Sequence, residues 1–168
     1  RADECTACLQ ELAQLQAQHA RAVSAYQWWR DHSGIPARFA GKTVAGWRPA
    51  GKPNQQAHDL VTRYSQAIKP QVQAGRGIVL LGPVGTGKTH ILTALTADAI
   101  EAGIRACYAV WPSVIARHRD AQADRKHADR DLLEYLATCE LLAVDELGLT
   151  DLTPWQAGEL FRLIDARY

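Results

Sequence analysis

The opening segment, residues 4–30, repeats apolar side chains at three- and four-residue steps. These side chains are Leu9, Leu12, Leu15, Val23 and Tyr26. This period predicts one long amphipathic helix. We expect it to end at Ser33 and Gly34, because glycine permits the left-handed turn that ends helices and Pro36 cannot continue one.

The following residues, 35–53, hold several glycines and prolines without a regular period, so we interpret them as a linker. A second helix is predicted over residues 54–73. Asn54 is a favourable first cap for it, and it should close before Gly75. This division gives a helical amino-terminal segment, 1–34, and one larger domain, 54–168.

The rest of the chain alternates between short apolar runs and longer helical segments. The runs at 77–81, 105–110 and 140–144 predict buried strands. Helices are predicted at 88–102, 112–118 and 131–138, and a last one begins at Thr153 and Pro154. Strands separated by helices indicate a parallel sheet covered on both faces, which is an α/β fold.

One glycine-rich string follows the first predicted strand and opens the next helix. Residues 82–89 read GPVGTGKT and fit the pattern G-x-x-x-x-G-K-[ST] of a P-loop. Backbone N–H groups at a helix start carry partial positive charge, and glycines let them close around an anion. Lys88 would add a full charge for the β- and γ-phosphates of ATP, and Thr89 a hydroxyl for Mg²⁺.

Two acids close the third predicted strand. The run LLAVDE ends in Asp145 and Glu146. Ligands of open α/β sheets gather at the carboxyl ends of strands, where both motifs lie. We expect Asp145 to bind the magnesium, directly or through water, and Glu146 to polarise a water that attacks the γ-phosphate. Lys88 and Glu146 are therefore the catalytic candidates.

Composition narrows these interpretations without changing them. A length of 168 residues suits one domain, and 47% hydrophobic with 22% charged residues is ordinary for a globular protein. A net charge of +1 gives no global attraction to nucleic acid. Without a membrane-length apolar run or a leader pattern, we expect a cytoplasmic protein with reduced thiols. The absence of methionine and the start at Arg1 predict a piece of a longer product.

Taken together, the strings GPVGTGKTH, LLAVDELG, IPARF and WPS resemble the DnaC/IstB family of AAA+ ATPases. The resemblance implies an AAA+ P-loop fold and either a helicase loader in DNA replication or a helper ATPase in transposition. It implies a ring helicase or a transposase as partner, and a homo-oligomer when full length. The nucleotide-binding set is then Gly82, Pro83, Val84, Gly85, Thr86, Gly87, Lys88, Thr89 and His90.

The same resemblance has two further implications. Members of this kind place a polar residue on the next strand, which lies between the P-loop strand and the acidic strand, and the sequence stops at Tyr168 before it. We therefore expect an incomplete domain with a gap in its sheet. Residues 35–39 would pack near the adenine, or would serve as a linker anchored by Phe39.

Three other features carry alternative interpretations. The charged tract at 117–131 would touch single-stranded DNA in similar loaders, or form a solvated surface with internal ion pairs. Cys5 and Cys8 have the spacing of half a zinc site, or are free thiols. Trp28 and Trp29 would dock a partner, or pack against the ATPase domain.

Two rival functions remain at this stage. One is a P-loop kinase that passes the γ-phosphate to a small molecule, although Glu146 favours water activation and no acceptor-binding segment is recognisable. The other is a nucleotide-gated binding module without turnover. Phosphate release without a phosphorylated product would separate the ATPase from the kinase, and tight binding without release would indicate the module.

Overall fold

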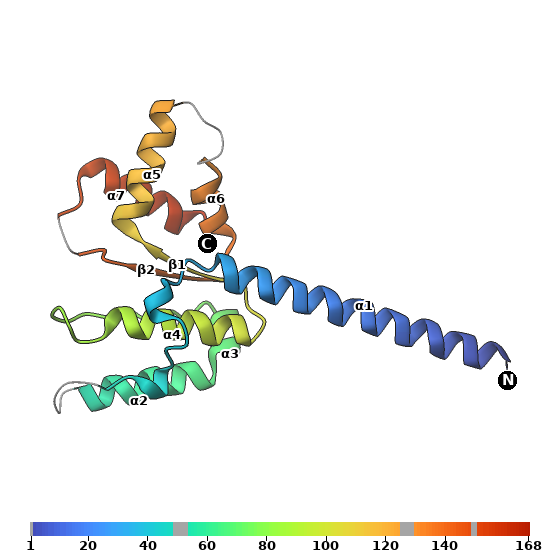
Figure 1. Ribbon diagram of the computed structural model, residues 1–168. Helices are drawn as coiled ribbons and strands as arrows, with labels where there is room; N and C mark the ends of the chain where they lie inside the picture. Colours follow the sequence, from blue (N-terminus) through green and yellow to red (C-terminus); the bar gives the residue numbers. More distant parts are fainter. Residues whose placement is uncertain (1, 49–53, 125–129, 149–150) are drawn as a thin grey trace.

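The protein is an α/β domain with one long helix projecting from it, seen in a computed structural model that describes residues 2–48, 54–124, 130–148 and 151–168 (Figure 1). Its elements, in chain order, are α1 (Ala2–His32), the 3-10 turns η1 (Ala37–Phe39) and η2 (Val44–Gly46), α2 (Asn54–Gln66), α3 (Ile68–Gln73), α4 (Lys88–Glu101), β1 (Ala106–Val110), α5 (Trp111–Asp124), α6 (Arg130–Thr138), β2 (Leu141–Asp145) and α7 (Pro154–Asp165).

The sheet within the described residues consists of β1 and β2, which run parallel. Their register pairs Ala106 with Leu141 and Val110 with Asp145, so both strands end at the same edge. Helices α5 and α6 form the crossover between them. Short apolar strands joined by a helical crossover form parallel pairs, so the α/β prediction is confirmed.

Helices cover both faces of this sheet (Figure 1). On one face lies α4, backed by α2 and α3. Val61 of α2 and Ile91, Leu95 and Ala99 of α4 are buried in the core on this face. On the other face α5, α6 and α7 contribute a second core. Its buried members are Cys107, Ala109, Trp111, Val114, Ile115, Leu136, Cys139 and Leu163. Cys107 and Cys139 are free thiols within that core.

The segment at 77–81 differs from its prediction as a buried strand. Ile78 and Leu80 pack against the core on the α4 side, while the alternate residues Val79 and Leu81 are 82% and 90% exposed. The segment has no regular secondary structure and no ladder partner within the described residues. An apolar run becomes a buried strand only when a neighbouring strand supplies hydrogen bonds and a second packed face, and none does so here.

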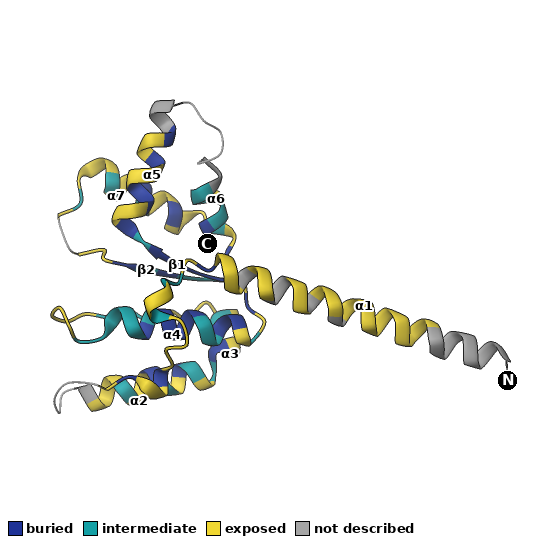
Figure 2. Ribbon diagram, viewed as in Figure 1, coloured by how far each residue is buried: buried dark blue, intermediate teal, exposed yellow. Residues whose placement is uncertain are grey.

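Helix α1 is confirmed, and it ends at Ser33 and Gly34 as expected. It points away from the domain, and every described side chain on it is exposed (Figure 2). The members of the predicted apolar stripe whose side chains the structure describes are therefore not covered: Leu12 and Leu15 are about half exposed, and Val23 is 41% exposed. No helix in the described ranges is both long and apolar enough to cross a membrane.

The helix predicted over residues 54–73 is wrong in being continuous, because the structure breaks it into α2 and α3 at Ala67. Pro70 explains the break, since proline has no N–H and its ring clashes with the carbonyl four residues earlier. That carbonyl belongs to Gln66, the last residue of α2. The helix predicted at 112–118 is longer than expected, at Trp111–Asp124.

Helix α7 begins as its sequence predicts. The Thr153 hydroxyl accepts from the Gln156 N–H (3.3 Å), while the Gln156 side chain accepts from the Thr153 N–H (2.9 Å). Pro154 occupies the first turn, where its missing N–H costs nothing. This reciprocal cap fixes where α7 starts, after β2 and its acids.

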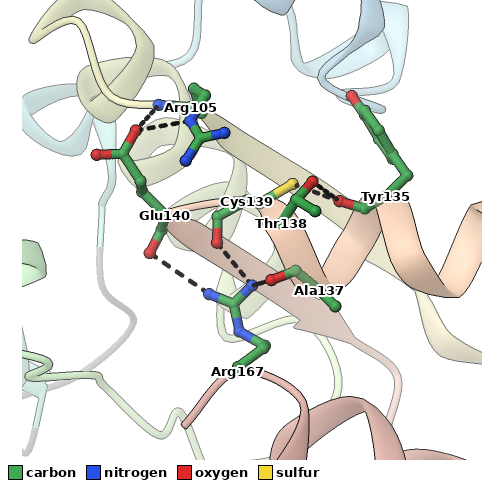
Figure 3. Close-up of polar contacts among 7 residues, drawn as sticks. All are labelled: Arg105, Tyr135, Ala137, Thr138, Cys139, Glu140 and Arg167. Atoms are coloured by element: carbon green, nitrogen blue, oxygen red, sulfur yellow. Dashed lines mark hydrogen bonds and ion pairs between the residues drawn. The ribbon is translucent and has the colours of Figure 1, made fainter.

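A polar cluster closes the amino-terminal edge of the sheet (Figure 3). We call it the Arg167 cluster and define it as Arg105, Glu140 and Arg167 with the carbonyls that Arg167 contacts. The Arg167 guanidinium donates to the carbonyls of Leu136, Ala137, Cys139 and Glu140 at 2.7–3.4 Å. Glu140 in turn accepts from the backbone and the side chain of Arg105, each at 3.1 Å.

Candidate nucleotide-binding site

The glycine-rich string forms a tight loop that leads into α4. Gly87 caps the helix with φ of 89°, in the left-handed region that favours glycine. A Cβ at Gly87 would lie 2.5 Å from Trp47 Nε1, so this glycine also admits the indole. Within the loop the Thr86 hydroxyl donates to the Pro83 carbonyl (3.0 Å). The loop thus opens a 14-residue helix whose first N–H groups suit an anion.

Lys88 lies across this loop. Its ammonium donates to the carbonyls of Gly82 and Pro83, both at 2.8 Å. These acceptors are neutral, and phosphate oxygens form stronger charge-assisted hydrogen bonds with an ammonium. When a triphosphate binds, the Lys88 ammonium can therefore exchange its hydrogen bonds to these carbonyls for stronger ones to phosphate oxygens.

Thr89 and Asp145 meet at the edge where β2 ends. The Thr89 hydroxyl donates to Asp145 Oδ2 at 2.7 Å, although the two residues come from α4 and β2. Asp145 is 7% exposed. The structure thus brings together the two residues that the sequence assigned to magnesium.

Asp145 has two further donors. The Tyr108 hydroxyl on β1 donates to Oδ2 at 2.8 Å, and the Glu146 backbone N–H donates to Oδ1 at 2.9 Å. Burial raises the pKa of Tyr108, and the hydrogen bond to Asp145 raises that pKa further, so the hydroxyl stays protonated at neutral pH. A buried carboxylate with these donors is held in one orientation.

Sequence reasoning missed Tyr108, although the strand pattern contains a signal for it. Cys107 and Ala109 face the α5 side of the sheet, so alternation turns Tyr108 to the α4 side. Leu141 of β2 packs on that side, and Asp145 follows it at an even spacing. A tyrosine among apolar strand residues, on the same face as an acid, marks a polar contact.

The side chains present fit a magnesium ion. The hydroxyl of Thr89 and the carboxylate of Asp145 are hard oxygen donors, which Mg²⁺ prefers. Magnesium is usually held by one or two protein groups together with phosphate oxygens, so two ligands suffice. Among the described residues no group of three or more His, Cys, Asp or Glu converges in the way a zinc site requires.

Glu146 follows Asp145 and leaves the strand sharply. Its φ is 62°, in the left-handed region that a residue with a side chain seldom adopts. Its side chain is exposed. Strained backbone of this kind concentrates at functional sites, where it aims a side chain that regular structure would direct elsewhere.

The linker contacts the glycine-rich loop and the start of α4 through Trp47 and Thr43. Trp47 donates from Nε1 to the Thr86 carbonyl (3.2 Å), and His90 Nε2 lies 2.8 Å from the Thr43 carbonyl. Trp47 also stacks on His58, with ring centroids 5.7 Å apart. Sequence reasoning did not identify Trp47, and the ring of His90 faces the linker.

Two of the residues that the family resemblance places near the adenine lie beside the end of α4. Ile35 and Phe39 line a cavity of about 250 Å³ with Ala97, Asp98 and Glu101, at the carboxyl-terminal end of α4. That end is roughly 15 Å along the helix axis from Lys88. This geometry agrees with the alternative interpretation, a linker anchored by Phe39.

The charged tract is only partly a solvated surface. His118 is buried and lies 3.6 Å from the buried Glu159 of α7, while Arg119 is exposed beside Asp120. His118 therefore joins α5 to α7 and is not available to DNA. The basic run at 125–127 lies outside the described residues.

The remaining sequence candidates lie on α1. Trp28 stacks on His32 and meets the Tyr135 ring of α6 edge-on at 6.1 Å, so the end of α1 packs against the α/β domain. Trp28 is still 45% exposed. The side chains of Cys5, Cys8 and Trp29 lie outside the described part of the chain.

Comparisons with known proteins agree with this geometry. A family model described as "IstB-like ATP binding protein" matches residues 56–168. A Pseudomonas aeruginosa protein named for ATP binding and insertion sequence IS21 is 33% identical over 97 residues, which covers 58% of this chain and 36% of that protein. A Bacillus thuringiensis protein named for insertion sequence IS232 is 31% identical over 91 residues, covering 54% and 36%. The chain thus spans about a third of these relatives' length.

Two other similarities extend further along the chain. YqaM of Bacillus subtilis, described as uncharacterized, is 27% identical over 146 residues, covering 81% of this chain and 45% of that protein. AMPPCP-bound DnaA from Aquifex aeolicus superposes with a TM-score of 0.59 at 20% identity, covering 77% and 39%. This structural likeness shows the AAA+ P-loop fold. Because the family match covers more than half of the sequence, the chain belongs to the family of IstB-like ATP binding proteins.

Proposed function

We propose that this chain binds ATP with Mg²⁺ at the loop before α4, hydrolyses it, and serves as the helper ATPase of a transposase. The observation that carries the proposal is the 2.7 Å contact between Thr89 and Asp145 beside Lys88. Two motifs that lie far apart in the sequence converge there, at the edge of the sheet where α/β proteins bind ligands.

Each residue then has one role. The amides of residues 82–89 and the ammonium of Lys88 hold the phosphates, while Thr89 and Asp145 hold the metal. Bound magnesium neutralises charge on the phosphate oxygens. Glu146 is the base that orients and polarises the attacking water, and its exposed position on a strained turn suits that role.

The relatives favour transposition over replication. Several of them are named for insertion sequences, which supports a transposase as the partner. The names of these relatives do not mention helicase loading, so that role stays a prediction. Binding of single-stranded DNA, assembly with further copies and a cytoplasmic location also stay predictions.

The test separates binding from turnover. Affinity for mant-ATP, a fluorescent ATP analogue, is measured by titration, and phosphate release is measured with ATP and Mg²⁺, alone and with transposase and DNA. We expect Glu146→Gln to keep its nucleotide affinity within about twofold and to lose about 100-fold or more in turnover, the usual contribution of a general base. The matched control is Glu140→Gln, an exposed glutamate at the other end of β2.

Four results would contradict parts of the proposal. Equal turnover by Glu146→Gln and the original chain would remove Glu146 from catalysis. Tight binding without phosphate release, even with transposase and DNA, would favour a nucleotide-gated module. A phosphorylated small molecule in place of free phosphate would favour a kinase. Capture of a ring helicase but not the transposase in a pull-down would assign the chain to replication.

A further inference from the structure

Tyr108 is buried inside the nucleotide site without belonging to either sequence motif. It lies on β1, 6% exposed, and its hydroxyl meets Asp145 Oδ2 at 2.8 Å. A phenylalanine would fill the same apolar space without requiring a hydrogen-bond partner, because the two rings differ by one hydroxyl. The hydroxyl and its contact with Asp145 therefore distinguish Tyr108 from a residue that only fills space.

The hydrogen bonds of Asp145 define what this hydroxyl does. A carboxylate offers about four lone-pair positions. Thr89 and Tyr108 occupy both positions on Oδ2, and the Glu146 N–H occupies one on Oδ1. Without Tyr108, Oδ2 would keep a single donor and the carboxylate could turn more freely about its terminal bond.

The backbone of Tyr108 is fixed from outside the sheet as well. Its N–H donates to the Ser33 carbonyl at 2.7 Å. The adjacent Gly34 approaches so closely that a Cβ there would lie 2.2 Å from the Tyr108 carbonyl oxygen, and its φ of 76° also favours glycine. Because β2 pairs with the other edge of β1, the ring has one defined position relative to Asp145.

We propose that Tyr108 is a positioning residue for the metal site: its hydroxyl holds the Asp145 carboxylate in the orientation that receives magnesium. The inference rests on the proposed ATP site and adds to it a residue from β1. In this proposal Tyr108 acts through Asp145, to which its hydroxyl donates, and is not itself a ligand of the metal. The loss of the hydroxyl should therefore affect magnesium use and leave phosphate binding intact.

The first experiment uses Tyr108→Phe and compares mant-ATP affinity in EDTA with affinity across a Mg²⁺ titration. The expected result is wild-type affinity in EDTA, because the loop and Lys88 are unchanged. The Mg²⁺ concentration at the midpoint should rise about tenfold, in line with one lost hydrogen bond to a charged group. The matched control is Tyr64→Phe, which removes another buried tyrosine hydroxyl, one that donates to the Arg76 carbonyl at 2.7 Å. This control should shift neither value.

Two outcomes of this titration would overturn the inference. An unchanged Mg²⁺ midpoint in Tyr108→Phe would reduce Tyr108 to packing. An equal loss of affinity with and without Mg²⁺ would indicate a general structural effect. A chain that binds no nucleotide at all would refute the proposed function itself.

A second experiment tests the contact without nucleotide. Tyr108→Phe is made alone and in an Asp145→Ala background, and urea unfolding is followed for all four chains. We expect Tyr108→Phe to lower the unfolding midpoint of the original chain. In the Asp145→Ala background it should leave the midpoint unchanged or raise it, because the hydroxyl there has lost its acceptor. The same decrease in both backgrounds would refute the contact even if nucleotide binding had failed.

Discussion

The two strands carry polar clusters at both ends, and the clusters differ in their partners. At the carboxyl end Asp145 bonds to the hydroxyls of Thr89 and Tyr108. At the amino end the Arg167 guanidinium bonds to carbonyls around the end of α6 (Figure 3). The first set consists largely of side chains that can exchange partners. The second satisfies fixed backbone groups that the helix end leaves without partners.

This difference separates ligand chemistry from structure. An arginine that caps a helix stabilises the fold because it supplies hydrogen bonds to carbonyls that would otherwise have no partner. Its loss should therefore lower stability. A lysine that spans a loop is held loosely and gains stronger partners when a phosphate arrives. We therefore expect the loss of Lys88 at the carboxyl end to change binding with little effect on stability, and the loss of Arg167 at the amino end to do the reverse.

The largest effect should come from Lys88→Ala at the carboxyl end. Loss of the ammonium should weaken ATP affinity about 100-fold or more, because a charged donor to phosphate is removed. The unfolding midpoint should stay nearly constant, since the lost partners are carbonyls of an exposed loop. Calorimetric ATP titration and urea unfolding measure both quantities. Lys69→Ala, an exposed lysine on α3, is the control. A large loss of stability in Lys88→Ala would remove the contrast between the two ends.

The next effect should come from Arg167→Ala at the amino end. Arg167 donates to four carbonyls, two of them within 2.8 Å, so its loss should lower the free energy of unfolding by about 2 kcal/mol. ATP affinity should change by less than about twofold, because the sheet keeps its register. Urea unfolding and ATP titration provide the comparison.

Arg167→Lys sharpens this prediction. Lysine keeps the positive charge but lacks the planar fork that reaches several carbonyls at once. It should recover only a minor part of the lost stability. Full recovery by lysine would mean that charge near the end of α6, and not the fork geometry, carries the effect.

The smallest effect should come from Glu140→Gln. The hydrogen bond from the Arg105 backbone, followed by that from its side chain, holds the pKa of Glu140 below its ordinary value of 4.5. A folded-state pKa below the unfolded value stabilises the protein above about pH 4.5, and this contribution is lost as the pH falls through the folded-state pKa. Both side chains are about half exposed, so the difference at pH 7 should stay below about 1 kcal/mol.

Urea unfolding of both chains between pH 7 and pH 2.5 measures this dependence. The stability difference between the original chain and Glu140→Gln should be largest at neutral pH and disappear in acid. A difference that persists at pH 2.5 would show that the carboxylate charge is not its source. A loss of ATP affinity in Glu140→Gln would contradict the separation of the two ends.

The sequence predicted the parts of the molecule that depend on local patterns. The loop at 82–89, Asp145 and the cap at Thr153 were identified because each combines chain-neighbouring residues with one physical role. Residues that act across the fold were missed. Tyr108 reaches Asp145 from another strand, and Arg167 reaches α6 from the end of α7. Strand alternation indicates the face of the sheet on which Tyr108 lies, but no spacing along the chain pairs Tyr108 or Arg167 with its partner.

Two errors have different origins. The break between α2 and α3 is explained by Pro70, because proline interrupts helix hydrogen bonding, and the single helix predicted over residues 54–73 ignored this effect. The strand at 77–81 could not be settled from its own residues, because an apolar run becomes a buried strand only through its neighbours. The placement of Ile35 and Phe39 near the adenine came from family resemblance and stays a prediction, while the linker residue that meets the loop is Trp47.

The close approach of Gly34 to Tyr108 places the base of α1 directly against β1. The 31 residues of α1 form a rod of about 46 Å, most of it free of the domain. A tilt of about 10° at that base displaces the far tip by roughly 8 Å, as the arm length dictates. A sideways force at the far tip would therefore act as a torque on the base of α1, next to the strand that carries Tyr108.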